Sequence, residues 1–341
     1  MKNVIRQIAV LVLVAQVFAQ SAAPTSPKPA PAPARWRGLI GEYGPDNEIV
    51  YILEKDGKLW ASFKRAAPEQ LLPDSENVFV FSLVSTHANQ WIVFTRNNRG
   101  RAAQFIIRGT TYQRRRIEPE AGANQLRVPP VRPVPELIKE ALAAQPPTEI
   151  GEFSPSDLVE LIKLDPAIRL DVRYATTNNL FGAVFYSEPR AFLQRPAAES
   201  LVRVNARLKP LGYGLLVHDA YRPWYVTKVF WDATPADKKL FVANPSQGSR
   251  HNRGCAVDIT LYDLKTKKPI EMVSTYDETT DRAYPDYPGG TSLQRWHRDL
   301  LRTAMEAEGF KVYPAEWWHF DFNDWQKYPI LNVRFDQIST K

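Results

Sequence analysis

The sequence contains a single cysteine, Cys255, among its 341 residues. An intramolecular disulfide is therefore excluded, and a chain of this length with 44% hydrophobic residues can be stabilised by packing alone. The net charge is also small, since 44 Lys and Arg residues are nearly balanced by 37 Asp and Glu residues. Because this small excess is not gathered into a basic stripe with interleaved aromatic residues, nucleic acid is not expected as a partner.

Long apolar runs are missing except near the N-terminus. Lys2 and Arg6 precede an apolar stretch from Ile8 to Phe18, and small residues follow it. This pattern is typical of a signal peptide, and the stretch is too short to span a bilayer comfortably. We expect residues 1–23 to be a cleaved signal peptide, with an uncleaved anchor as the alternative. The protein would then be exported to the periplasm or cell envelope, without stable membrane insertion after cleavage.

Two proline-rich segments divide the remaining chain. Residues 24–35 are rich in Pro and Ala, so we expect an extended linker that buries little apolar surface. Residues 119–153 are the second such segment, and they are predicted to connect an N-terminal module, 36–118, to a catalytic domain, 154–341.

The segment 36–118 has the pattern of a small all-β module. Two runs with strand composition, 48–53 and 58–63, lie on either side of Asp56-Gly57, which is a strong hairpin signal. We predict an antiparallel barrel or sandwich. It offers no cluster of metal ligands or paired carboxylates, so its ligand is not indicated; contact with the cell envelope through this module is a further expectation.

The segment 154–341 mixes helical and strand patterns. This mixture predicts an α+β fold in which a small antiparallel sheet is flanked by helices. One helix is expected over Pro196–Leu208, ending near Gly212, and Ser292 is placed to cap another that ends near Gly309. Strands are expected at residues 215–217, 256–261 and 317–322.

Candidate metal ligands occur in a first polar motif, residues 249–258, Ser-Arg-His-Asn-Arg-Gly-Cys-Ala-Val-Asp. A straight strand would separate His251 from Asp258 by roughly 23 Å. The two side chains can therefore bind one metal ion only if the chain turns between them. Asn252 and Gly254 are residues that tolerate such a turn.

A second polar motif, Glu-Trp-Trp-His, begins at Glu316 and ends at His319. On an ideal strand these two residues point to opposite faces, so Glu316 must lie in irregular backbone at the strand entrance for both to reach one site. Two imidazoles and one carboxylate are a normal ligand set for catalytic zinc, with one position left for water. The candidate ligands of one Zn²⁺ per chain are His251, Asp258 and His319, and Glu316 is the candidate general base. Surface-loop histidines and a backbone-bonded Asp258 are the alternatives.

These motifs resemble those of a known family. Ser-x-His-x-x-Gly-x-x-x-Asp, followed far downstream by Glu-x-Trp-His, is similar to the zinc D-Ala-D-Ala metallopeptidases, and most similar to D-alanyl-D-alanine dipeptidases of the vancomycin-resistance type. Three further segments match the family: residues 171–179, residues 218–223 with the sequence His-Asp-Ala-Tyr-Arg-Pro, and Tyr276-Asp277, where tyrosine replaces the family's phenylalanine. The resemblance covers roughly residues 160–335 and excludes the β module.

The resemblance implies zinc-dependent hydrolysis of the dipeptide D-alanyl-D-alanine, in connection with peptidoglycan metabolism. It also implies that His251, Asp258 and His319 bind the zinc ion, that Glu316 is the acid/base, and that Arg222 stabilises the transition state. A guanidinium with fixed donors is suited to an oxyanion. For Arg222, a structural ion pair is the alternative.

A dipeptide substrate carries a charge at each end, close to its single scissile bond. Asp277 is expected to receive the substrate ammonium, and Ser249 is expected to donate to the substrate carboxylate. The partner expected for this chain is therefore a small dipeptide.

Other functions use parts of the same pattern. A peptidoglycan D,D-carboxypeptidase or endopeptidase would share the zinc site, but a longer substrate brings no ammonium to Asp277. A non-catalytic envelope-binding protein would not need Glu316 as a base beside its metal. A non-haem iron oxygenase also uses two histidines and a carboxylate, but the Glu-x-x-His context and the export signal disfavour it.

Overall fold

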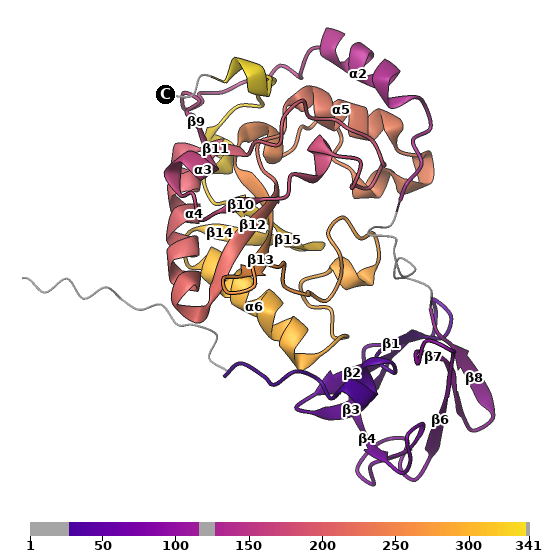
Figure 1. Cartoon of the computed structure of the whole chain (residues 1–341). Helices are drawn as coiled ribbons and strands as arrows, with labels where there is room; N and C mark the ends of the chain where they lie inside the picture. Colours follow the sequence, from indigo (N-terminus) through magenta and orange to yellow (C-terminus); the bar gives the residue numbers. More distant parts are fainter. Residues whose placement is uncertain (1–26, 116–126, 339–341) are drawn as a thin grey trace, which may run out of the picture.

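The computed structural model describes residues 27–115 and 127–338. The expected signal peptide, residues 1–23, lies outside the described residues. Figure 1 shows an N-terminal β body joined to a larger body of helices and strands. In the described part of the chain, no helix is both long and apolar enough to cross a bilayer.

The N-terminal body is an eight-stranded antiparallel sheet whose strands follow one another in chain order. A bridge between Tyr43 and Arg114 brings the first strand against the last, so the sheet is nearly closed, as the predicted small barrel requires. The expected hairpin is confirmed, with Asp56 and Gly57 both at positive φ between paired strands. A short helix, α1 (Ala34–Arg37), precedes the sheet. The strands are β1 (Gly41–Tyr43), β2 (Val50–Lys55), β3 (Lys58–Phe63), β4 (Glu69–Pro73), β5 (Val78–Phe81), β6 (Trp91–Arg96), β7 (Ala102–Ile107) and β8 (Thr110–Gln113).

The larger body is built on a five-stranded sheet in the order β10-β12-β13-β15-β14. Its strands are β10 (Arg169–Leu170), β12 (Tyr213–Asp219), β13 (Ala256–Asp263), β14 (Phe310–Tyr313) and β15 (Glu316–Phe322). A separate pair joins β9 (Leu158–Glu160) and β11 (Phe192–Gln194). The helices are α2 (Val134–Ala143), α3 (Leu161–Leu164), α4 (Arg195–Leu208), α5 (Trp224–Ala233) and α6 (Ser292–Glu306).

The prediction of a purely antiparallel sheet is wrong at one edge. Strand β10 pairs in parallel with β12, whereas the other neighbours in this sheet are antiparallel. Parallel neighbours need a long crossover connection, and the chain between β10 and β12 supplies one that includes α4. Because β10 has only two residues, its sequence carries no periodicity from which this pairing could be predicted.

Helices α4 and α6 pack against the core of the sheet, and both carry the expected end signals. The helix predicted over Pro196–Leu208 is confirmed, and Gly212 follows it with a left-handed φ of 87°. The cap of α6 is Thr291 rather than Ser292. The Thr291 side chain accepts a hydrogen bond from the backbone N–H of Gln294, and the Gln294 side chain accepts one from the backbone N–H of Thr291.

Strand β2 and the turn after it attach the β body to the larger body. Tyr51 and Leu53 belong to the same buried cluster as the apolar residues of α4 and the larger sheet. Buried Glu54 accepts a hydrogen bond from the backbone N–H of Ser292 at 2.8 Å, at the N-terminus of α6. A carboxylate in this position satisfies a free helix donor and favours the helix dipole. The β body is therefore fixed to the larger body by buried contacts.

Candidate metal centre and active site

The candidate ligands come from two paired strands and one tight turn. Asp258 on β13 and His319 on β15 are direct cross-strand partners, so their side chains emerge side by side on one face of the sheet. His251 begins a single 3₁₀ turn, and Gly254 follows this turn at φ 67° before β13 starts. This left-handed residue supplies the turn that the sequence required between His251 and Asp258.

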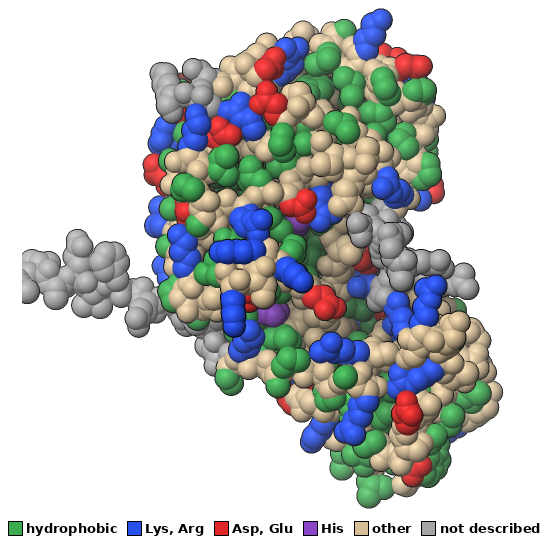
Figure 2. All heavy atoms as spheres, in the orientation of Figure 1, with side chains coloured by type: hydrophobic (Ala, Val, Ile, Leu, Met, Phe, Trp, Pro, Cys, Tyr) green, Lys and Arg blue, Asp and Glu red, His purple; other side chains and the backbone are tan. Residues whose placement is uncertain are grey.

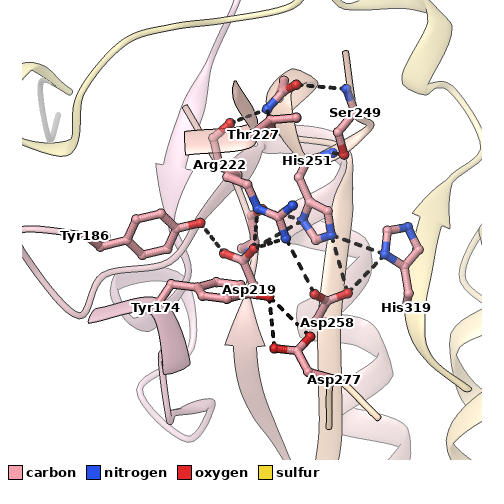
Figure 3. A network of polar contacts seen from close by, with 12 residues as sticks. Tyr174, Tyr186, Asp219, Arg222, Thr227, Ser249, His251, Asp258, Asp277 and His319 are labelled. Atoms are coloured by element: carbon pink, nitrogen blue, oxygen red, sulfur yellow. Dashed lines mark hydrogen bonds and ion pairs between the residues drawn. The ribbon is translucent and has the colours of Figure 1, made fainter. Parts of the chain in front are cut away.

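The three side chains converge on one point inside the protein (Figure 3). Asp258 Oδ1 lies 3.4 Å from His251 Nε2 and 3.0 Å from His319 Nδ1, and the two ring nitrogens are 3.2 Å apart. Ligand atoms bonded tetrahedrally to zinc at about 2.0–2.2 Å are separated by about 3.3–3.6 Å. The buried Oδ1 atom of Asp258 has no hydrogen-bond partner within the described ranges. The donor set therefore fits a zinc ion in both spacing and chemistry.

Neighbouring groups fix the orientation of both imidazole rings. His251 Nδ1–H donates to the carbonyl oxygen of Ala220 at 2.7 Å, which turns Nε2 toward Asp258. His319 Nε2–H donates to Asp321 Oδ1 at 3.0 Å, which turns Nδ1 toward the same point. A hydrogen bond at the outer nitrogen sets the tautomer and raises the basicity of the nitrogen that binds the metal.

Within this cluster, the charged forms of Asp258 and His319 stabilise each other. Burial alone would raise the pKa of Asp258, but the His251 and His319 rings hold this pKa well below its usual range. Burial likewise lowers the pKa of His319, but the Asp258 and Asp321 carboxylates outweigh it and raise this pKa to about 10. The carboxylates of the cluster thus favour a cation at this point, as a metal site requires.

Glu316 reaches the cluster from the first residue of β15. The irregular backbone that the sequence demanded is a register shift between Val312 and Tyr313, opposite the start of β15. Glu316 Oε2 lies 3.6 Å from His319 Nδ1. Burial raises the pKa of Glu316, an effect that His319 opposes and Asp258 reinforces. A raised pKa makes a carboxylate beside a metal site a better proton acceptor than an ordinary carboxylate.

Arg222 lies behind the ligands and is held by a buried carboxylate. Its Nε and Nη2 atoms donate to Asp219 Oδ2 at 2.9 and 2.6 Å, and Tyr186 Oη donates to the other Asp219 oxygen at 2.7 Å. The Nη2 atom also lies 4.0 Å from Asp258 Oδ2. The guanidinium is therefore ion-paired, as the structural alternative expected, and it is also held beside the metal ligands, where a transition-state role would need it.

Asp277 lies close to the same cluster in a half-buried position. Tyr174 Oη lies 3.2 and 3.0 Å from its two carboxylate oxygens, and the backbone of Asp277 has a left-handed φ of 60°. Burial and the nearby Asp258 carboxylate raise the pKa of Asp277 to about 8. A carboxylate that is costly to ionise in this way is stabilised by an incoming cation.

Ser249 lies at the turn that carries His251 (Figure 3). Its hydroxyl oxygen accepts from the backbone N–H of His251 at 3.2 Å. That bond uses the oxygen as an acceptor, so the hydroxyl hydrogen can be donated to another group.

The sequence assigned no role to several residues that orient the cluster. Asp321 follows His319 by two positions on a strand, and this period-two spacing could have revealed that the two share a face. Asp219 stands three positions before Arg222, inside a quoted motif, but its ion pair depends on the bend after β12. Tyr276 was noted only as a replacement for phenylalanine, yet its hydroxyl donates to Asp258 Oδ2 at 2.8 Å.

Two further residues with metal-binding side chains, Cys255 and His297, lie outside the three-residue cluster. Cys255 is fully buried just before β13, and burial raises its pKa to about 12, which keeps the thiol protonated and unreactive. His297 is buried on α6, where its Nε2 lies 2.9 Å from Tyr213 Oη.

Comparisons with known proteins point to one family. Residues 155–338 match the peptidase family described as D-ala-D-ala dipeptidase. A D-alanyl-D-alanine dipeptidase of Escherichia coli is 30% identical over 180 residues, which cover 53% of this chain and 92% of that protein. Dipeptidases of the same name from Enterococcus faecalis and Enterococcus faecium are 32% and 34% identical, over 49% and 50% of this chain and 92% and 91% of their own lengths.

Proposed function

The chain belongs to the D-Ala-D-Ala dipeptidase family of metallopeptidases, and we propose that it hydrolyses D-alanyl-D-alanine to two D-alanines with zinc held by His251, Asp258 and His319. The observation that carries the proposal is the convergence of these three ligand atoms, all buried and all within 4.8 Å of one another. Zinc, when bound, lowers the pKa of a coordinated water molecule and polarises the scissile carbonyl.

Glu316 is the proton carrier in this proposal. Its carboxylate takes a proton from the attacking water and then delivers it to the amine of the departing D-alanine, so one residue serves as base and acid. Its position 3.6 Å from His319 Nδ1 and its raised pKa support both roles. Glu316 is partly exposed, unlike the three ligands, so a substrate can approach it.

Arg222 stabilises the negative charge that develops on the carbonyl oxygen. Its guanidinium is buried and is fixed by two bonds to Asp219, so little reorganisation is needed when the charge appears. Donors that are oriented before the reaction are more effective than donors that must be ordered during it. Asp219 is a positioning residue for Arg222.

The two charged ends of the dipeptide are bound by different groups. Asp277 accepts the substrate ammonium, which offsets the cost of ionising this half-buried carboxylate. Ser249 donates its hydroxyl hydrogen to the substrate carboxylate while its oxygen remains bonded to the backbone of His251. Trp317 and Trp318 are buried on the strand that carries Glu316 and His319, and they limit access of water to the site.

The N-terminal pattern of residues 1–23 supports export of the chain to the periplasm or cell envelope. The peptides of peptidoglycan, which carry D-alanine residues, are in the same compartment. An exported dipeptidase would act on D-alanyl-D-alanine that is released from, or destined for, this polymer.

A direct test compares D-alanyl-D-alanine with a peptidoglycan pentapeptide that ends in the same two residues. The proposal expects D-alanine release from the free dipeptide and little from the pentapeptide, because the longer peptide has no ammonium for Asp277. Comparable turnover of both substrates would reject the dipeptidase in favour of a D,D-carboxypeptidase, and turnover of neither would reject both enzymes.

A further inference from the structure

A large cavity lies between the β body and the larger body, outside the metal site. Its volume is about 1170 Å³, and none of His251, Asp258 and Glu316 lines it. Tyr276 connects the two sites, because its ring lines the cavity and its hydroxyl bonds to Asp258. The cavity therefore adjoins the catalytic centre without being part of it.

The cavity is a fixed feature of the fold. On the β body, buried Glu42 lines it and accepts a hydrogen bond from Tyr287 Oη of the larger body at 2.8 Å. The contact between Glu54 and the N-terminus of α6 lies beside it and is also buried. These two contacts hold the walls of the cavity at a set separation.

The wall contributed by the β body is strongly cationic. Seven arginines of that body line the cavity against two glutamates, whereas lysine, arginine and acidic side chains balance on the opposite wall. Figure 2 shows lysine and arginine side chains gathered along the waist between the two bodies. Arg37 and Arg99 are exposed members of this wall.

Neutral acceptors hold two of these guanidinium groups in place. Arg114 donates to Ile40 O at 2.6 Å and to Tyr43 Oη at 2.9 Å. Arg96 donates to Asn77 Oδ1 at 2.6 Å and to Arg35 O at 3.0 Å. Uncharged acceptors fix the direction of the Arg114 guanidinium without cancelling its charge, so this part of the wall is organised in advance for an anion. Arg96 also lies 4.0 Å from the exposed Glu76 carboxylate, and Arg115 is ion-paired with Glu42 and Asp46.

We propose that this cavity binds the carboxylate-bearing peptides of peptidoglycan and thereby docks the enzyme on the cell-wall polymer. The inference rests on the proposed function, which places the substrate in peptidoglycan metabolism. Arginine forks match carboxylates in geometry and charge. The volume exceeds that of most sites for single small ligands, which fits a peptide chain of several residues. A concave site between two bodies also suits a polymer strand better than a flat membrane surface.

The opposite wall adds apolar surface to this charge. Ile270, Met272 and Leu293 line it, so a peptide side chain or a sugar face can pack there while carboxylates contact the arginines. A polymer held in this cavity lies next to the dipeptidase site but does not occupy it. Docking and hydrolysis are therefore separable properties of the chain.

The test is co-sedimentation of the full-length protein with purified insoluble peptidoglycan. The variant carries Arg37→Glu together with Arg99→Glu, two exposed changes that leave the core and the metal ligands intact. We expect its dissociation constant to rise about tenfold, because the two glutamates would repel the carboxylates that the arginines attract. The measurement is made at low salt, where contacts between exposed charges are least screened. The control is Arg108→Glu, an exposed arginine of the same body outside the cavity lining, which should bind like the unmodified protein.

Two further arms separate this inference from other outcomes. Peptidoglycan whose carboxylates have been converted to amides should bind as weakly as the double variant does. Binding of the unmodified protein to vesicles of anionic phospholipid as tight as its binding to peptidoglycan would overturn the proposal, as would equal co-sedimentation of the double variant and the control.

Hydrolysis of free D-alanyl-D-alanine should be unchanged in the double variant, whereas Glu316→Gln should lose hydrolysis and still co-sediment. These readouts keep failure of docking distinct from failure of the proposed activity.

Discussion

Asp321 Oδ1 accepts a hydrogen bond from His319 Nε2 at 3.0 Å, across two positions of the same strand. This contact leaves Nδ1 of His319 directed at Asp258 and His251. Arg250 Nε lies 3.6 Å from the other oxygen of the same carboxylate, Asp321 Oδ2. The candidate metal ligand His319 is thereby oriented by a residue outside the proposed ligand set.

Asp321→Asn should weaken zinc binding by about 10–100-fold, which is the usual cost of losing a carboxylate behind a ligating histidine. Competition with a chromophoric chelator measures this affinity without reference to activity. The control is Asp324→Asn, an exposed carboxylate just after the same strand that pairs with Lys327. Unchanged zinc affinity in Asp321→Asn would show that the contact does not orient His319 for the metal.

Glu316→Gln should lower kcat by about 10²–10⁴-fold and leave zinc content unchanged, because the carboxylate transfers protons but does not bind the metal. Steady-state hydrolysis of D-alanyl-D-alanine and metal analysis of the same preparation give both quantities. Glu306→Gln, an exposed change on α6, is the control. Near-normal turnover in the Glu316 variant would assign the base to another residue.

N-acetylation of D-alanyl-D-alanine should lower kcat/KM roughly tenfold to a hundredfold, because it removes the ammonium that would pair with the half-buried Asp277 carboxylate. Asp277→Asn should reduce the preference for the free dipeptide by impairing that substrate more than the acetylated one. Asp281→Asn, in the same segment but half-exposed, should retain the preference. If Asp277→Asn kept the preference for the free dipeptide and Asp281→Asn lost it, the ammonium site would lie elsewhere.

His297 should make stability depend on pH in mild acid. Burial and the nearby Lys28 lower its pKa to about 4 in the folded protein, whereas a free histidine has a pKa near 6.5. Between these values the unfolded chain binds the extra proton, so stability is lost as the pH falls from about 6.5 to about 4, by up to about 3 kcal/mol. Denaturant unfolding of the protein and of His297→Gln across this range should give a smaller loss in the variant; equal losses would contradict the pKa shift.

Local patterns allowed much of the fold to be predicted. The hairpin at Asp56-Gly57 and the end of α4 at Gly212 depend on backbone conformations that few residues adopt, so the sequence shows them directly. The turn between His251 and Asp258 was required because a straight strand would hold the two side chains too far apart to bind one metal ion. The structure provides this turn at Gly254. For these features the cause lies within about ten residues of the chain.

Features that depend on distant segments could not be predicted in the same way. The parallel pairing of β10 with β12 depends on the path of a long crossover, and the hydrogen bond from the Ser292 backbone to Glu54 joins residues far apart in sequence. The ion pair of Asp219 with Arg222 depends on the bend that follows β12. In each of these three cases the sequence shows only a two-residue segment or a single polar residue, which cannot be distinguished from an ordinary surface pattern.

Zinc titration of the metal-free protein, with hydrolysis of D-alanyl-D-alanine as the readout, tests the central claim most directly. Because the three proposed ligands, His251, Asp258 and His319, form a single cluster, activity should rise linearly with added zinc and stop rising at about one zinc ion per chain. His251→Ala should show no such rise at the same concentrations. Full activity of the metal-free protein, or an equal rise in the His251 variant, would contradict the account.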